Sequence, residues 1–157
     1  FTFPAGCHIC EIEVDAETGK TEIVNWTAVD DFGNVINPMI VEGQIHGGIA
    51  QGLGLAVMEE IIQTDGVIRN GNFTDYLLPT FLDMPDVVAT LIEEPDPHAP
   101  LGAKGVGELG TVGATPTVTA IISTSWKKLP MKITESFCAS PMPAHRISSG
   151  MKAEAGR

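Results

Sequence analysis

The stretch LGAKGVGELGTVGATP, residues 101–116, is the most unusual part of the sequence. It contains only two charged residues, Lys104 and Glu108, among five glycines: Gly102, Gly105, Gly107, Gly110 and Gly113. So many glycines in one place indicate backbone that approaches another group closely or adopts positive φ angles. Glu108 is therefore predicted to be a single carboxylate held beside a ligand.

Two simpler interpretations of this stretch have to be weighed. Residues 105–110, GVGELG, fit the dinucleotide fingerprint G-x-G-x-x-G, which follows a buried strand and opens a helix. The preceding residues, EEPDPHAPLGAK, are not a strand, so this context argues against a dinucleotide site. The second interpretation is a surface turn, in which Glu108 is solvated or complements the dipole of a helix that starts near Thr111 or Thr115.

Residues 37–62, NPMIVEGQIHGGIAQGLGLAVMEEII, are predicted to begin and continue as a helix. Asn37 suits the N-cap and Pro38 suits the first helical position. The apolar residues recur at helical spacing; they are Ile40, Val41, Ile45, Ile49, Leu53, Val57 and Ile61.

This predicted helix also holds five glycines: Gly43, Gly47, Gly48, Gly52 and Gly54. Each costs up to about 1 kcal/mol relative to alanine in a helix interior. Close approach of another helix, a backbone or a bound cofactor would compensate for that cost. A membrane span is the alternative, but four polar side chains argue against it: Glu42, Gln44, His46 and Gln51.

The remaining pattern predicts an α+β fold. Residues 15–20 should form the turn of an N-terminal β-hairpin, and residues 63–69 a short strand or turn. Residues 112–126 are predicted to be a helix with Pro116 in its first turn. The strands expected are residues 8–14, 22–30, 87–92 and 132–134. Strands and helices mix without a sustained βαβ alternation.

Composition limits the partners and the number of domains. The 157 residues carry a formal net charge of −11, which argues against nucleic acid. Of the 20 acidic residues, 18 precede Lys127, whereas six of the nine basic residues lie from Lys127 onward. This basic tail is predicted either to dock electrostatically or to be a solvated terminus. Residues 1–157 are expected to form a single unit.

The cysteines are interpreted as structural. Cys7 and Cys10 form a C-x-x-C pair, and Cys138 is the third cysteine. Three thiols cannot hold a four-thiolate iron–sulfur cluster. If one strand includes both residues of the pair, they fall on opposite faces, so we expect small buried side chains. Free thiols suit a cytoplasmic location.

Three motifs, in this order, carry a resemblance to a known family: DDFGNVINPMIVEGQIHGGIAQGLGLAVMEE, NFTDYLLPTFLDMPDV and PLGAKGVGELGTVGATPTVTAI. Together they resemble the C-terminal part of the molybdopterin-binding large subunit of the xanthine dehydrogenase and aldehyde oxidase family. The branch that includes the carbon monoxide dehydrogenase large subunit is the most similar. The resemblance covers residues 1–122, whereas the basic tail, residues 127–157, departs from the family. It implies a partial molybdopterin-binding domain, a fragment that is inactive by itself.

The resemblance also implies site residues. The glutamate of the family's G-V-G-E motif is the base beside the molybdenum, and this sequence has it as Glu108. Gln44 occupies the position that hydrogen-bonds the pterin in relatives, and Gly105, Val106 and Gly107 would let the backbone approach the cofactor. A partly dry site is expected around Glu108. His46 and Gln51 are interpreted as packing or capping groups.

The family further implies cofactors, partners and a reaction. The cofactor expected is molybdenum–molybdopterin, in its cytosine dinucleotide form, shared with the rest of the large subunit. Iron–sulfur clusters and FAD are expected on partner chains or domains. The reaction would oxidise an aldehyde, a heterocycle or a similar small substrate with oxygen derived from water. The alternative is a non-catalytic fragment or interaction module built on the same fold.

Overall fold

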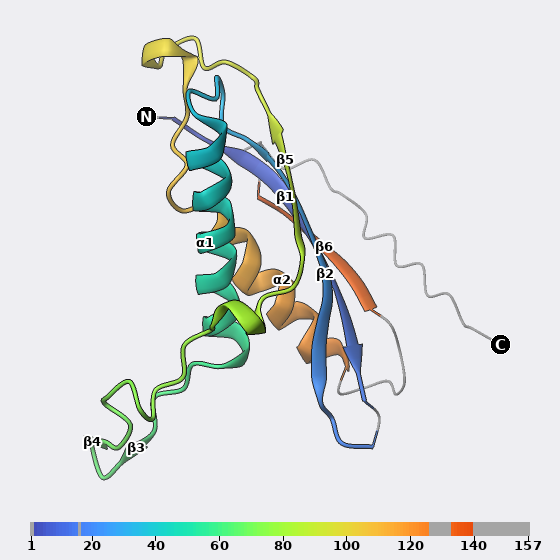
Figure 1. The fold of residues 1–157 in the computed structure, drawn as a ribbon, viewed down its shortest axis with the longest axis vertical. Coiled ribbons are helices and arrows are strands. Elements are labelled where there is room, and N and C mark those ends of the chain that lie inside the picture. The colour runs from blue at the N-terminus through green and yellow to red at the C-terminus, as the bar shows by residue number, and fades with distance from the viewer. Residues whose placement is uncertain (1, 16, 126–132, 140–157) are drawn as a thin grey trace, which may run out of the picture.

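A four-stranded sheet covered on one face by two helices forms the body of the molecule (Figure 1). The computed structural model describes residues 2–15, 17–125 and 133–139. The strand order is β5-β2-β1-β6. The second helix, α2, packs against β1 and β6, and the first, α1, packs mainly against α2. The predicted mixture of strands and helices is therefore observed.

The predicted N-terminal hairpin is confirmed as β1 (Ala5–Val14) and β2 (Thr21–Asp31), which pair antiparallel. The first strand begins earlier than expected, because pairing continues to Ala5 opposite Asp31. In the turn, one carboxylate oxygen of Asp15 accepts hydrogen bonds from the N–H groups of Glu17 and Thr18 at 2.8 and 2.7 Å. This Asx-type turn fixes the register of the hairpin.

The other two strands extend the hairpin on both sides. The strand β5 (Val87–Ile92) has the predicted bounds and runs parallel to β2. The strand β6 (Ile133–Ala139) pairs antiparallel with β1. The strand predicted over 132–134 is therefore present but longer, and Lys132 lies outside the described residues.

The helix α1 (Pro38–Val57) confirms the predicted start. Asn37 is the N-cap and its side chain accepts a hydrogen bond from the N–H of Ile40. The helix ends before Ile61, which the periodic pattern had included. The N–H groups of Met58 and Glu59 both donate to the carbonyl of Gly54, at 3.0 and 2.8 Å, and this closes the last turn.

The helix α2 (Leu109–Ser125) begins three residues earlier than predicted. Pro116 therefore lies in the interior of the helix and not in its first turn, which corrects the prediction. The early start follows from packing. A Cβ atom added to Gly110 would lie 2.9 Å from the carbonyl oxygen of Ile45, so the first turn of α2 lies directly on α1.

Two glycines of α1 make this contact close, as the glycine pattern predicted. A Cβ atom added to Gly48 would lie 2.9 Å from the backbone nitrogen of Thr111, and one added to Gly52 would lie 2.6 Å from the Cβ of Ala114. The Thr111 hydroxyl also donates to the carbonyl of Gly48 at 3.1 Å. Contacting residue numbers rise together along both helices, so α1 and α2 run in the same direction.

The core lies between the helices and the sheet. Its buried hydrophobic residues come from both layers: Cys10, Ile12, Trp26, Ala28, Phe32, Val41, Ile45, Ile49, Leu53, Leu109, Ala114 and Val118. Cys10 is buried as predicted, whereas Cys7, on the opposite face of β1, is only half-buried. Of the helices in the described part of the chain, none is long and apolar enough to cross a membrane.

One buried polar pair interrupts this core. The Nε2 atom of His8 lies 3.2 Å from both carboxylate oxygens of Asp30, and both side chains are almost fully buried. Gly6 leaves room for the Asp30 carboxylate, and a Cβ atom added to Gly113 would lie 2.6 Å from Nδ1 of His8. Gly113 is therefore explained by this pair, although the sequence placed it in a ligand-binding stretch.

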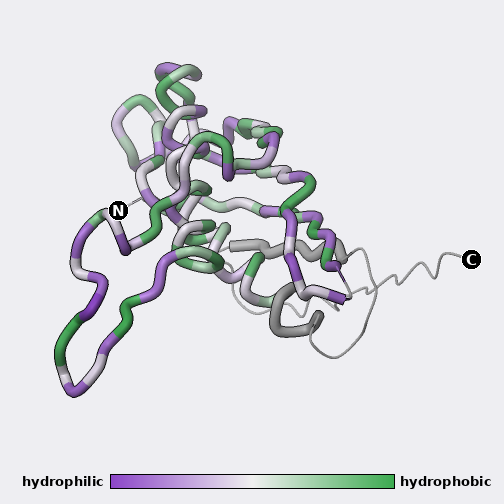
Figure 2. Tube along the Cα trace, turned by 60° about the horizontal axis from the view of Figure 1, so that its bottom comes forward, coloured by the Kyte–Doolittle hydropathy of each residue, from purple (hydrophilic) through white to green (hydrophobic). Residues whose placement is uncertain are grey.

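Residues 59–86 form an arm, of which the part around residues 63–68 projects from the body (Figures 1 and 2), whereas Met84 packs against the core. A hairpin of two very short strands, β3 (Gln63–Thr64) and β4 (Val67–Ile68), lies within the region where a short strand or turn is predicted. A single 3-10 turn, η1 (Phe81–Asp83), follows it. The arm exposes many large hydrophobic side chains: Ile61, Ile62, Val67, Ile68, Phe73, Leu77, Leu78, Phe81 and Leu82.

Candidate functional site

The glycine-rich stretch that contains Glu108 is fixed at its start by a charged pair. The Nζ atom of Lys104 lies 2.5 Å from Oδ2 of Asp31 at the end of β2. The other carboxylate oxygen, Oδ1, accepts from the N–H groups of Gly33 and Glu94, at 2.9 and 3.1 Å. Desolvation raises the pKa of Asp31, but these three donors and the lysine charge outweigh it and hold the pKa below its usual range.

Backbone bonds reinforce the same junction. The N–H of Lys104 donates to the carbonyl of Phe32 at 2.8 Å, and the N–H of Asn34 donates to the carbonyl of Gly102 at 3.0 Å. Gly33 has φ of +64°, and Gly102 has φ of +67°. Gly102 therefore adopts the left-handed conformation that the sequence leads us to expect in the glycine-rich stretch, and Gly33 adopts it in the turn after β2.

Residues 105–108 make fewer hydrogen bonds than the junction at Lys104. The N–H of Gly105 donates to the Thr2 hydroxyl at 3.1 Å. Within the described chain, Val106 and Gly107 make no hydrogen bond through backbone or side chain. A Cβ atom added to Gly107 would meet nothing within 4 Å. Gly105 and Gly107 are exposed, as a ligand-approaching loop would require, whereas the Val106 side chain is half-buried and packs against the core.

Glu108 stands immediately before α2. Its carbonyl accepts the hydrogen bond from the N–H of Val112 at 3.0 Å, so it occupies the N-terminal boundary of the helix. Its carboxylate is exposed and has no hydrogen-bond or ion-pair partner among the described residues. The described chain by itself therefore does not form the partly dry site expected around Glu108. A free carboxylate at a helix start fits a base and equally a solvated side chain that complements the dipole.

Gln44 lies on α1 at the same end of the helix pair. Gly48 is opposite Gly110 and Thr111, and Gln44 is one helical turn before Gly48. The side chain of Gln44 is exposed. Its neighbours Gly43 and Gly47 are also exposed, and a Cβ atom added to either would meet nothing within 4 Å. The structure therefore leaves an open backbone surface around Gln44.

The two other polar residues of α1 differ from each other. Gln51 contacts α2, since the Thr111 hydroxyl lies 3.3 Å from its Oε1 atom, which agrees with the packing role predicted for it. His46 is exposed and has no polar partner in the part of the chain that the structure describes. The packing or capping role predicted for His46 is therefore wrong.

Neither Asp31 nor a role for Lys104 was predicted from the sequence. One signal was available: Lys104 is the only lysine or arginine between Arg69 and Lys127, in a strongly acidic part of the chain. Many carboxylates in this acidic part of the chain are candidate partners for it. Its partner is 73 residues away in sequence, so only the fold identifies it.

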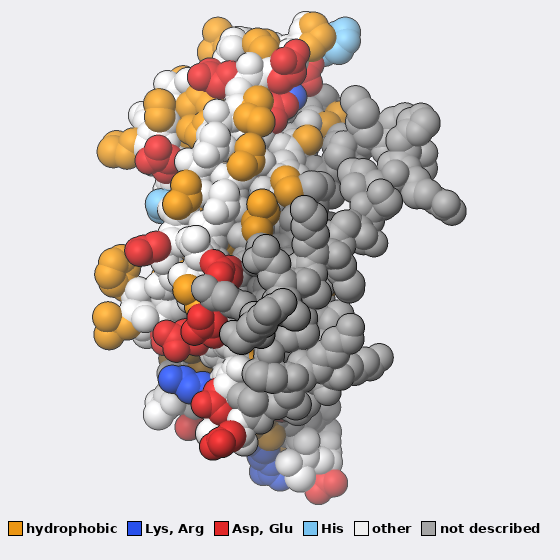
Figure 3. Space-filling view, turned by 90° about the vertical axis from the view of Figure 1, so that its right-hand side faces the viewer, with side chains coloured by type: hydrophobic (Ala, Val, Ile, Leu, Met, Phe, Trp, Pro, Cys, Tyr) orange, Lys and Arg blue, Asp and Glu red, His pale blue; other side chains and the backbone are white. Residues whose placement is uncertain are grey.

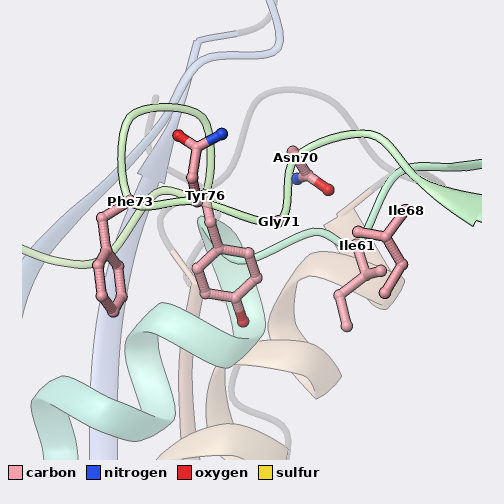
Figure 4. Close-up of a pocket in the computed structure, with 7 residues that line it drawn as sticks. Ile61, Ile68, Asn70, Gly71, Phe73 and Tyr76 are labelled. Atoms are coloured by element: carbon pink, nitrogen blue, oxygen red, sulfur yellow. The ribbon is translucent and has the colours of Figure 1, made fainter.

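Other surface features lie apart from this region. A cavity of about 390 Å³ in the arm is lined mainly by Ile61, Ile68, Phe73 and Tyr76 (Figure 4). The side of the molecule shown in Figure 3 carries interspersed hydrophobic and acidic side chains. In the described residues, no three histidine, cysteine or carboxylate side chains are grouped as a metal site.

Comparison with known proteins identifies the family. Residues 1–85 match the family model described as a molybdopterin cofactor-binding domain. The chain belongs to this family. It is 41% identical over 123 residues to the carbon monoxide dehydrogenase large chain of Hydrogenophaga pseudoflava, which covers 78% of this chain and 15% of that protein. It is 38% identical over 105 residues to the xanthine dehydrogenase molybdenum-binding subunit of Escherichia coli O157:H7, covering 66% and 14%.

Solved structures agree. Quinoline 2-oxidoreductase from Pseudomonas putida 86 matches with a TM-score of 0.69 and 43% identity, over 75% of this chain and 15% of that one. A Cu,Mo-CO dehydrogenase matches with a TM-score of 0.72 and 36% identity, over 78% and 16%. The predicted family and fold class are confirmed. The chain spans about 15% of the length of the curated relatives it matches.

Proposed function

We propose that this chain supplies part of the catalytic site of a molybdenum hydroxylase large subunit. The reaction class is oxidation of an aldehyde, a heterocycle or a similar small substrate with oxygen from water. The relatives include large chains and subunits of carbon monoxide and xanthine dehydrogenases, which supports an oxidoreductase of this group. Substrate choice would depend on parts of the subunit other than this chain.

One observation carries the proposal. The exposed Glu108 carboxylate and the exposed Gln44 amide lie at the same end of the α1–α2 pair, beside glycines whose missing Cβ atoms leave open space. The chain's residues thus fit a flat cofactor that lies against bare backbone. Nothing in the described chain uses these two polar groups for its own folding.

Each group has a distinct role in this proposal. An amide both donates and accepts hydrogen bonds, so Gln44 suits the mixed polar edge of a pterin. Gly105, Val106 and Gly107 offer backbone groups to the same cofactor. Glu108 acts as the general base that accepts the proton released as oxygen is transferred to the substrate. When bound, the molybdenum cofactor supplies the redox chemistry by accepting the substrate's two electrons.

The partners follow from the same role. The rest of the large subunit would cover Glu108 and dry the site, which this chain alone leaves exposed. The hydrophobic side chains on the arm offer a surface on which that polypeptide would pack. A cytosine dinucleotide form of the cofactor, and iron–sulfur and flavin partners that carry electrons away, complete the proposal.

Metal analysis tests the proposal. The matching segment of the Hydrogenophaga pseudoflava large chain is replaced by residues 1–122 of this chain, and molybdenum per protein is measured. We expect the chimera to retain molybdenum and Gln44→Ala to reduce its content. The isolated chain, expressed in a host that makes the cofactor, should retain almost none, because half of a binding site leaves its polar groups hydrated. A near-stoichiometric metal content in the isolated chain would contradict this division of the site.

A further inference from the structure

The carboxylate of Asp31 joins three segments that are distant in sequence. It accepts hydrogen bonds from Gly33 just after β2, from Glu94 just after β5, and from Lys104 before α2. The side chains of Asp31 and Lys104 are only 15% and 12% exposed. A charge-assisted bond that is shielded from water is stronger than an ordinary surface pair.

The neighbouring carboxylate, Asp30, holds a second point of the same segment. Consecutive strand residues point to opposite faces, so Asp30 faces the helices while Asp31 does not. Asp30 bonds to His8, and the His8 ring fills the space left by Gly113 in α2. Glu108 lies between Lys104 and Gly113. Two adjacent aspartates of β2 therefore fix the chain on both sides of it.

Between Lys104 and Gly113, the segment that precedes α2 has few hydrogen bonds of its own. Residues 106–107 make no hydrogen bonds among the described residues, and the glycines around them add backbone freedom. The Val106 side chain packs against the core and the N–H of Gly105 donates to Thr2, so these contacts and the attachments at both ends together set the position of the segment. The attachment before α2 is the Asp31–Lys104 pair, together with the bond from the N–H of Lys104 to Phe32.

We infer that Asp31 and Lys104 are a positioning pair, which places residues 105–108 and thereby aims the Glu108 carboxylate at the open surface beside Gln44. The inference rests on the proposed role of Glu108 in catalysis. Neither residue touches the reacting atoms in this scheme. They act through the segment that follows them.

Amide hydrogen exchange in the isolated chain gives the first test. Asp31→Asn and Lys104→Met should each speed exchange of the Lys104 and Asn34 amides by about five- to tenfold, because the local opening that the pair resists becomes easier. Lys104→Arg should restore slow exchange. The double variant should resemble either single one. Asp65→Asn, the same chemical change in the exposed turn of the arm, is the matched control and should leave these amides unchanged.

The chimeric large chain gives the second test. Asp31→Asn should keep molybdenum content but lower kcat about tenfold, with a smaller change in KM, and Lys104→Arg should keep most of the turnover. Unchanged exchange in Asp31→Asn would overturn the inference, and so would faster exchange with unchanged kcat. If Glu108→Gln keeps full turnover, the proposed function fails instead, whatever the exchange rates show.

Discussion

Four of the five glycines of α1 form two groups with different surroundings, and the fifth, Gly54, lies against Glu59 and Pro79. Gly48 and Gly52 lie against α2, where a Cβ atom would come within 2.9 and 2.6 Å of its atoms. A Cβ atom added to Gly43 or Gly47, on the same helix, would meet nothing within 4 Å. The comparison shows that one residue type serves two purposes here. The first pair permits helix packing, and the second keeps the surface beside Gln44 free of side chains.

The energetics of the two groups differ accordingly. Gly48 and Gly52 lose helix propensity but permit close contact and the hydrogen bonds from Thr111 and Thr115 to their carbonyls. Gly43 and Gly47 lose up to about 1 kcal/mol each with no contact in the described chain to offset it. Their compensation would have to come from outside this chain, which agrees with a cofactor or further polypeptide there.

The largest expected effect concerns the chemistry at the open surface. In the chimeric large chain, Glu108→Gln keeps the side-chain size but removes the base. We expect turnover to fall by about 10²-fold or more, the scale of a lost general base. Molybdenum content, measured by elemental analysis, should not change. Asp65→Asn is the control, and near-normal turnover in a metal-replete Glu108→Gln protein would exclude Glu108 as the base.

The next effect tests the packed group. Gly48→Val should lower the stability of the isolated chain by roughly 1 to 3 kcal/mol, because the added methyl groups overlap the backbone of α2. Gly47→Val, one position away, is the matched control. It should not destabilise, since valine suits a helix better than glycine where space is open. Thermal melts of the two variants that shift equally would remove the distinction between the groups.

A smaller effect tests the glycines that face open space, where a substitution should raise stability. Gly47→Ala should raise the stability of the isolated chain by about 0.5 to 1 kcal/mol, because alanine orders the helix at less entropic cost. The same change in the chimeric large chain should reduce molybdenum content, since the new methyl group occupies the surface proposed for the cofactor. Gain of stability without loss of metal would show that the cofactor does not approach Gly47.

Local signals in the sequence predicted the elements whose ends they mark. Turn residues at 15–20 predicted the hairpin, and Asn37-Pro38 predicted the start of α1. The start of α2 was missed because it depends on Gly110 lying on α1, which no local rule contains. Pro116 predicted a later start, because the preference of proline for a first turn is weaker than that packing.

Only the site residues that belong to a family motif could be predicted from the sequence. Glu108 and Gln44 followed from the family resemblance, and the fold then brings both to one end of the helix pair. The Asp31–Lys104 and His8–Asp30 pairs could not be predicted, because each depends on tertiary structure that joins distant segments. A pattern of charges along the chain does not specify which carboxylate meets which cation.

The last expected effect depends on pH and concerns the Asp31–Lys104 pair. The pKa of Asp31 lies below its usual value in the folded chain. A carboxyl group of this kind stabilises the fold above its unfolded pKa, about 3.9 for aspartate, and loses that contribution as the pH falls through its lower folded value. Asp31→Asn should therefore be less stable than the parent chain at pH 7, by about 1 kcal/mol. The difference should shrink below about pH 3.9. Urea unfolding of both chains at several pH values measures it, with Asp65→Asn as the control. If the stability difference between the two chains stays constant down to acid pH, the Asp31 side chain stabilises the fold by its packing and hydrogen bonds and not by its charge.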